Sequence, residues 1–140
     1  MSTQKYKEPS GFRGYIFSRS INGNFIPQRV QNLVIKDFAN RKNLFFKLSS
    51  TEYIMNDCYL MLNALIKELK SLQGVIFYSF EMLPTSKKKR EELIKKILLK
   101  KKILYFALEE IKISNIKDFK KLNTILKLKS ETDKVKNLKL

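Results

Sequence analysis

Short apolar runs alternate along this chain with amphipathic segments of helical length. Strands are predicted at residues 13–19, 44–48, 75–78 and 103–108, because each run is brief and rich in aromatic and β-branched residues. Helices are predicted over 27–41, over the segment from the capping-box pattern Ser49-Ser50-Thr51-Glu52 to Gly74, over 86–101, and more weakly near 115–128.

The regular alternation of strand and helix is typical of a parallel sheet. We therefore expect one α/β domain over residues 13–128, with a mostly parallel sheet of about four strands and helices on both faces. Residues 1–12 are interpreted as an N-terminal extension and residues 129–140 as a polar, flexible tail.

Net charge is +16, and the excess is concentrated late in the chain. Residues 1–84 hold 11 Lys+Arg against 6 Asp+Glu, whereas residues 85–140 hold 18 against 7, mostly as lysine. Such a surface can bind nucleic acid, anionic lipid or an acidic partner. It can equally be a set of solvated helix faces, which we favour because interleaved aromatic residues and arginines are few there.

The residue types present exclude several kinds of chemistry. There is no histidine and a single cysteine, Cys58, so an internal disulfide, a His-based triad and an ordinary zinc site are excluded, and no metal or cofactor is predicted. The first residues lack the apolar core of a signal peptide, and no apolar run is long enough to span a membrane. We expect a soluble cytoplasmic protein.

Ligands of open α/β sheets bind beyond the carboxyl ends of the strands. Arg19 is the expected anchor for an anion, since its guanidinium offers a fork of donors. The polar residues that we assign to ligand binding at this edge are Ser18, Arg19, Asn22, Gln28, Gln31, Asn32, Ser49, Thr51, Glu52, Tyr53, Tyr78, Ser79 and Glu109. Structural roles compete with this assignment: Arg19 could pair with Glu52 or Glu109, and Ser49 with Glu52 could simply cap a helix.

Two motifs resemble the catalytic domain of serine recombinases. They are Gly14-Tyr15-Ile16-Phe17-Ser18-Arg19 and Tyr78-Ser79-Phe80-Glu81-Met82-Leu83-Pro84. The resemblance implies a resolvase-like fold. It also puts Phe17 and Arg19 where that family has an arginine and its nucleophilic serine, and Glu81, Met82 and Thr85 where it has an aspartate and two arginines. Recombinase activity is therefore not expected.

More of the chain is similar to the sporadic carbohydrate cluster family, small proteins encoded among bacterial surface-polysaccharide genes. The matching segments are Arg13–Arg19, Asn22–Asn24, Pro27–Asn32, Leu48–Tyr53 and Tyr78–Pro84. The resemblance implies an accessory protein of polysaccharide biosynthesis, and we expect it to bind a small anionic sugar or sugar nucleotide at the strand ends.

Two alternatives remain from the sequence: a basic nucleic-acid-binding module, and a catalytically inactive resolvase-like scaffold that docks on a glycan-pathway enzyme. No complete catalytic set can be named, so the sequence leaves enzymatic activity open. It leaves a homo-oligomer open as well.

Overall fold

A computed structural model describes residues 10–138, with side chains up to residue 132. The elements, in chain order, are β1 (Phe12–Phe17), α1 (Gln28–Arg41), β2 (Phe46–Glu52), α2 (Leu60–Lys67), the short 3-10 helix η1 (Glu68–Ser71), β3 (Gly74–Phe77), the 3-10 helix η2 (Phe80–Met82), α3 (Lys87–Leu99), β4 (Ile103–Phe106), β5 (Ile111–Ile113) and α4 (Ile116–Leu138). The predicted extension at 1–12 falls largely outside the described residues.

These strands form one sheet in the order β2-β1-β3-β4-β5, with β5 alone antiparallel to its neighbour. The predicted α/β class and mostly parallel sheet are confirmed. The strand count is five rather than about four, because Ile111–Ile113 pairs with β4 after a tight turn.

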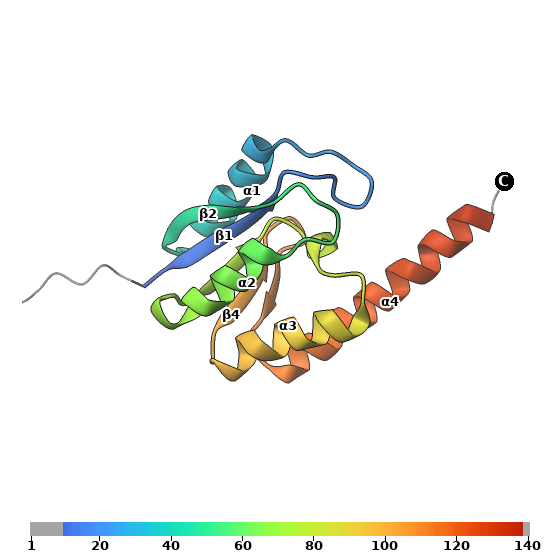
Figure 1. The fold of residues 1–140 in the computed structure, drawn as a ribbon. Coiled ribbons are helices and arrows are strands. Elements are labelled where there is room, and N and C mark those ends of the chain that lie inside the picture. Colours follow the sequence, from blue (N-terminus) through green and yellow to red (C-terminus); the bar gives the residue numbers. More distant parts are fainter. Residues whose placement is uncertain (1–9, 139–140) are drawn as a thin grey trace, which may run out of the picture.

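Helices cover both faces of the sheet (Figure 1). On one face α1 contributes Phe38, which packs against Tyr105 of β4 with the ring centroids 5.2 Å apart. On the other face Tyr15, Phe77 and Phe106 form a buried row across three strands, with centroids 4.8 and 5.6 Å apart. Helices α2 and α3 cover this row. The middle strands are therefore buried on both faces, which explains why their sequences are wholly apolar.

The predicted capping box was wrong. Residues 49–52 do not begin a helix; they form the second half of β2, which runs from Phe46 to Glu52 instead of ending at residue 48. Helix α2 starts only at Leu60. Pairing with β1 prevails over the local pattern, since Ser50, Thr51 and Glu52 lie opposite Tyr15, Ile16 and Phe17 in a parallel ladder.

Helix α4 is longer than predicted. It continues to Leu138, whereas a helix end near residue 128 and a polar tail from 129 were expected. The segment contains neither glycine nor proline and is rich in lysine and leucine, so nothing in it interrupts a helix. Figure 1 shows its C-terminal part projecting away from the body.

Gly74 of β3 lies against the backbone of the adjacent strand β4. A Cβ atom placed there would lie 1.9 Å from the carbonyl oxygen of Ile103 and 2.9 Å from the ring of Phe12. Only glycine fits at this point, because the clash would be with the backbone of the adjacent strand rather than with a movable side chain end.

Candidate functional site

A buried carboxylate organises the carboxyl edge of β1 and β2. Glu52 is 1% exposed and accepts hydrogen bonds from the Tyr15 hydroxyl at 2.8 Å and from three backbone amides, those of Tyr53, Met61 and Leu62, at 3.0 to 3.1 Å. Two of these amides belong to the first turn of α2, so Glu52 caps that helix from a neighbouring strand. Burial, and then the bond to Glu52, raises the pKa of the Tyr15 hydroxyl.

Arg19 holds the loop between β2 and α2. Its Nη1 atom donates to the carbonyl oxygens of Tyr53, Met55 and Cys58 at 2.9 to 3.2 Å. Its guanidinium lies 3.9 Å from the centroid of the Phe17 ring. The structure thus gives Arg19 backbone partners rather than the Glu52 or Glu109 pairing considered above. Its predicted role as the anchor for a ligand stays a prediction.

Gln31 is fully buried on α1 and bonds to the end of β1. Its side chain accepts from the Phe17 amide at 2.9 Å and donates to the carbonyl oxygens of Phe17 and Ile26, each at 2.8 Å. Asn32, the next residue of α1, accepts a 2.6 Å bond from the Ser49 hydroxyl of β2. Both amides, predicted as ligand groups, join the helix to the sheet.

Ser79 and Glu109 meet at the ends of β3 and β4. The Ser79 hydroxyl donates to one Glu109 oxygen at 2.6 Å, and the Phe80 amide donates to the other at 2.9 Å. Burial raises the pKa of Glu109, and the bonds from Ser79 and Phe80 offset part of that effect. The pKa of nearby Tyr78 is raised too, by burial and then by the Glu109 charge.

The other predicted ligand residues have simpler surroundings. Ser18 donates to the Glu52 carbonyl oxygen at 2.9 Å, and Asn22 lies in a turn with its amide 3.4 Å from Glu81. Gln28 and Tyr53 are exposed, and Thr51 is half-buried on β2. Most of the predicted ligand-binding residues therefore lie along one edge of the sheet. Many of their polar atoms form hydrogen bonds with one another or with the backbone.

A pH effect follows from Glu109. Because its native pKa is raised above the ordinary value of 4.5, the folded chain keeps this proton at pH values where the unfolded chain has lost it. The stability of the wild-type protein should therefore fall, relative to Glu109→Gln, as the pH rises from 4.5 through the native pKa. Urea unfolding at several pH values measures the difference. Glu92→Gln, at an exposed position, serves as the control, and parallel curves for E109Q and wild type would contradict the prediction.

Beside this edge the structure has a groove that opens toward solvent. Two adjoining hollows of 630 and 410 Å³ lie between the loop that follows β3 and helix α4. They share Thr85, Arg90, Leu126 and Ser130, and together we call them the α3–α4 groove. Its other lining residues are Asn22, Phe80, Glu81, Leu83, Pro84, Lys87, Asn123, Thr124, Lys127, Lys129 and Glu131.

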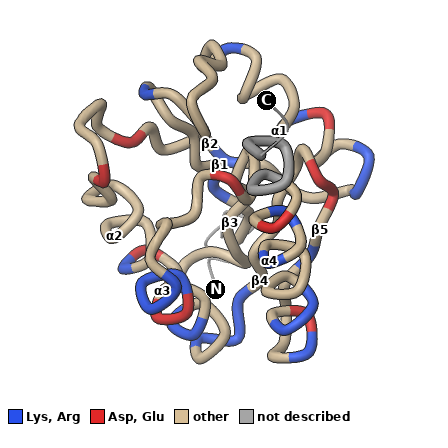
Figure 2. The backbone as a smooth tube through the Cα atoms, turned by 90° about the vertical axis from the view of Figure 1, so that its right-hand side faces the viewer, with Lys and Arg blue, Asp and Glu red and all other residues tan. Residues whose placement is uncertain are grey.

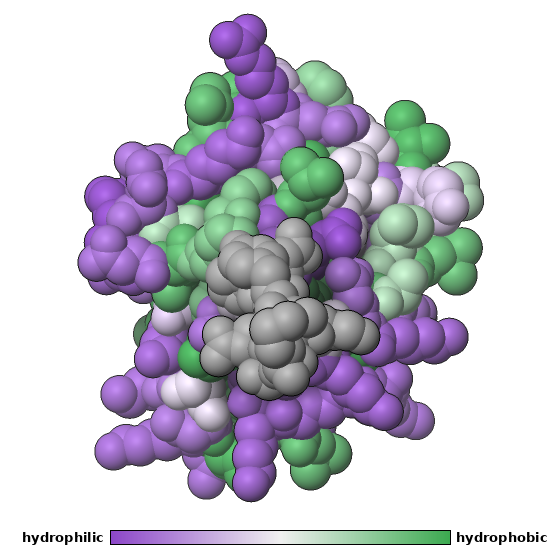
Figure 3. Space-filling model, turned by 90° about the vertical axis from the view of Figure 1, so that its left-hand side faces the viewer, coloured by the Kyte–Doolittle hydropathy of each residue, from purple (hydrophilic) through white to green (hydrophobic). Residues whose placement is uncertain are grey.

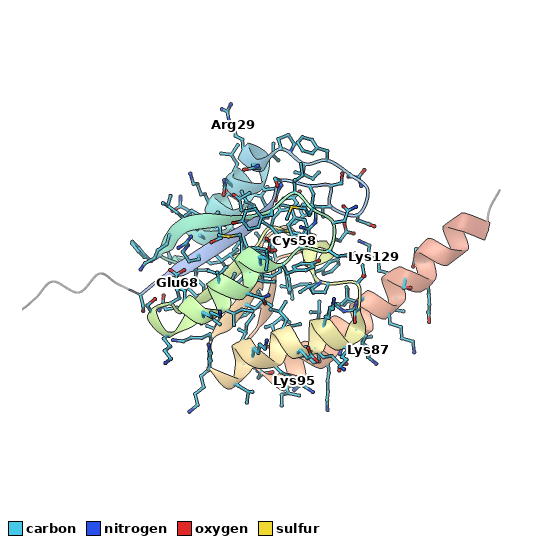
Figure 4. All side chains as sticks on the ribbon, viewed as in Figure 1. Arg29, Cys58, Glu68, Lys87, Lys95 and Lys129 are labelled. Carbon is cyan, nitrogen blue, oxygen red and sulfur yellow. The ribbon has the colours of Figure 1, made fainter. Side chains whose placement is uncertain are left out.

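Arg90 is the central cation of this groove. Its Nη1 atom donates to the carbonyl oxygens of Pro84 and Thr85 at 3.2 and 2.8 Å, which fixes the guanidinium against the loop. Its Nε atom is buried and has no hydrogen-bond partner among the described residues. Lys129 pairs with Glu81 across the groove. Figure 4 shows Lys87 and Lys129 near the place where α4 leaves the body, and Figure 2 shows Lys and Arg along α3 and α4.

Sequence reasoning assigned Asn22 to ligand binding but missed the rest of the α3–α4 groove. Lys87 and Arg90 belong to the lysine-rich part of the chain for which the sequence offered nucleic-acid binding as an alternative. The usable signal was Pro84-Thr85-Ser86, a turn followed by a helix start, because Ser86 accepts from the Lys89 amide and so fixes where α3 begins. The opposite wall comes from α4, and its last part, Lys129 to Glu131, lies in the segment for which a flexible tail was predicted.

Two further properties bear on the site. Among the described residues no group of three or more Asp, Glu, Cys or His side chains could hold a metal ion. No helix in the described part of the chain combines the length and apolar character needed to cross a membrane.

Comparison with known proteins supports the fold. No protein-family model matches the chain, and no curated protein matches its sequence. Among solved structures it is similar to the N-terminal catalytic domain of TP901-1 integrase, with a TM-score of 0.60 over 89% of this chain and 98% of that one. The sequences are 16% identical, so this likeness concerns the fold alone. The expected resolvase-like fold is thereby confirmed, whereas membership of the sporadic carbohydrate cluster family stays a prediction.

Proposed function

We propose that this protein binds a small, hydroxyl-bearing anion in the α3–α4 groove and does not act as a recombinase. The observation that carries the proposal is Arg90: two carbonyl oxygens fix its guanidinium at the groove, while its buried Nε atom has no hydrogen-bond partner in the described part of the chain. A buried donor without an acceptor costs about 1–3 kcal/mol. An anion that reorganises this corner of the groove would recover that energy.

The charges of the groove support an anionic ligand. Four cationic side chains line it, those of Lys87, Arg90, Lys127 and Lys129, against the two carboxylates of Glu81 and Glu131. One carboxylate, Glu81, is already paired with Lys129. Two of the cations, Lys87 and Arg90, lie in the first turn of α3. The dipole of this helix adds a further attraction for anions there.

The neutral lining supports a ligand with hydroxyl groups. Thr85, Thr124 and Ser130 carry hydroxyls, and Asn22 and Asn123 carry amides that both donate and accept. A sugar phosphate, sugar acid or nucleotide sugar would use both the cations and these neutral groups. The resemblance to the sporadic carbohydrate cluster family supports the same class, and with it an accessory role in surface-polysaccharide biosynthesis.

The residues at the positions implied by the recombinase resemblance support a role other than strand transfer. Phe17 is buried and stacks on Arg19, whose Nη1 atom is bound by three carbonyl oxygens of the adjacent loop. Met82 is fully buried. A nucleophilic hydroxyl with a cluster of arginines, as that chemistry requires, is not formed by these side chains.

The test is a thermal-shift screen with nucleotide sugars, sugar phosphates and sialic-acid-like sugars, followed by calorimetric titration of any ligand found. Arg90→Ala should weaken binding about tenfold or more, because a charge-assisted hydrogen bond is lost. Arg29→Ala is the matched control: it removes an exposed arginine on α1, on the far side of the molecule in Figure 4, and should leave affinity unchanged.

Two results would contradict the proposal. One is a screen in which no anion raises the melting temperature. The other is a ligand whose affinity survives Arg90→Ala but is lost in Arg19→Ala, which would favour the edge predicted from the sequence over the α3–α4 groove.

A further inference from the structure

The end of the molecule opposite the α3–α4 groove carries exposed aliphatic side chains. Leu99, at the C-terminus of α3, is 83% exposed, and Ile116, at the start of α4, is 66% exposed. Both border a hollow of 710 Å³ whose rim includes Lys95 and Lys117. Large aliphatic side chains exposed together at one place indicate an interaction surface.

The two segments that carry this apolar spot are rich in lysine. Residues 95–102 hold five lysines and no acidic residue, and residues 112–121 hold four lysines and one, Asp118. Asp118 is occupied by Ser114, whose amide and hydroxyl donate to it at 3.0 and 3.1 Å. Figure 3 shows hydrophilic side chains projecting from the lower part of this face, with apolar ones between them.

We infer that this end, which we call the basic apolar end, binds the surface of a membrane rich in anionic lipid. Lysine ammonium groups near such a surface are attracted to its negative potential, and exposed leucine and isoleucine enter the region between headgroup and acyl chain. The exposed lysines of both segments, Lys95 and Lys117 among them, would meet the headgroups while Leu99 and Ile116 reach past them.

The residue types favour lipid over other occupants. Protein interfaces are enriched in aromatic residues and arginine and depleted in lysine. The basic apolar end has the opposite composition, with many lysines and aliphatic rather than aromatic side chains. Nucleic acid would gain nothing from Leu99 and Ile116, which offer no face for base stacking. A second copy of the chain would bring like charges together, since each carries +16. This inference does not depend on the proposed ligand in the groove.

Co-sedimentation with vesicles tests it, using full-length protein and vesicles in which about a third of the lipid is phosphatidylglycerol, against pure phosphatidylcholine. We expect binding to the anionic vesicles only, weakening as salt rises. K95E/K117E should reduce the partition coefficient by about tenfold or more, and L99S/I116S by about tenfold. All four positions are exposed, so both variants should fold.

R29E/K36E on α1 is the matched control, because it makes the same change in net charge elsewhere. It should reduce binding far less than K95E/K117E. Equal losses for the two variants, or binding that L99S/I116S does not weaken, would overturn the assignment. Absence of binding to the anionic vesicles would also overturn it, and tight binding of a DNA duplex or an acidic amphipathic peptide would then identify the other occupant. Arg90→Ala should bind vesicles normally, which separates this test from that of the groove.

Discussion

Glu52→Gln is expected to destabilise the protein by about 3 kcal/mol, which lowers the melting temperature by roughly 10 °C. The Glu52 carboxylate accepts from the Tyr15 hydroxyl and from the Tyr53, Met61 and Leu62 amides while it is 1% exposed. An amide in its place turns one acceptor into a donor that faces other donors. Urea unfolding followed by circular dichroism measures the loss.

Glu68→Gln is the control for this prediction. Glu68 makes a surface ion pair with Arg13 at 3.1 Å, and its side chain is 40% exposed. Such pairs contribute between about 0 and 1 kcal/mol. If E52Q were no more destabilising than E68Q, the carboxylate would not be the organising group of this edge.

Gly74→Ala is expected to be as damaging, at roughly 3 kcal/mol or more, for a steric reason. The added Cβ would fall 1.9 Å from the Ile103 carbonyl oxygen, so β3 and β4 could not keep their present spacing. The free energy of unfolding, or a loss of folded protein on expression, reports the effect.

Gly23→Ala provides the comparison. Gly23 has a φ of +80°, but a Cβ there would meet nothing within 4 Å. Its cost is the backbone strain alone, about 1–2 kcal/mol. Equal destabilisation by the two substitutions would show that the close approach at Gly74 relaxes easily.

The sequence predicted the regular elements well where apolar periodicity was strong, as in α1 and α3. The prediction failed where a local sequence pattern competed with pairing to a strand that is distant in the sequence. Ser49 to Glu52 has the spacing of a capping box, and Glu52 does cap a helix, but one that begins eight residues later at Leu60. The local sequence cannot distinguish a helix start at Ser49 from a strand that continues to Glu52. The strand forms because these residues pair with β1, which lies more than thirty residues away in the sequence.

The candidate site was harder to predict for a related reason. The strand ends of a parallel sheet converge, so the sequence could place Arg19, Gln31, Glu52 and Ser79 at one edge. It could not show that these groups bond to one another and to backbone carbonyls. The α3–α4 groove depends on the path of α4, whose apolar and polar residues are almost evenly spread around the helix.

The bond between Gln31 and Phe17 has a consequence for slow motions. Phe17 ends β1, and its amide hydrogen is held by a side chain of α1 rather than by the neighbouring strand. Its exchange with solvent deuterium should therefore report the detachment of α1 from the sheet. If the first strand and the first helix open together, the Phe17 amide and the central amides of α1 will share one opening free energy, and the chain's first strand–helix pair will behave as a single cooperative unit.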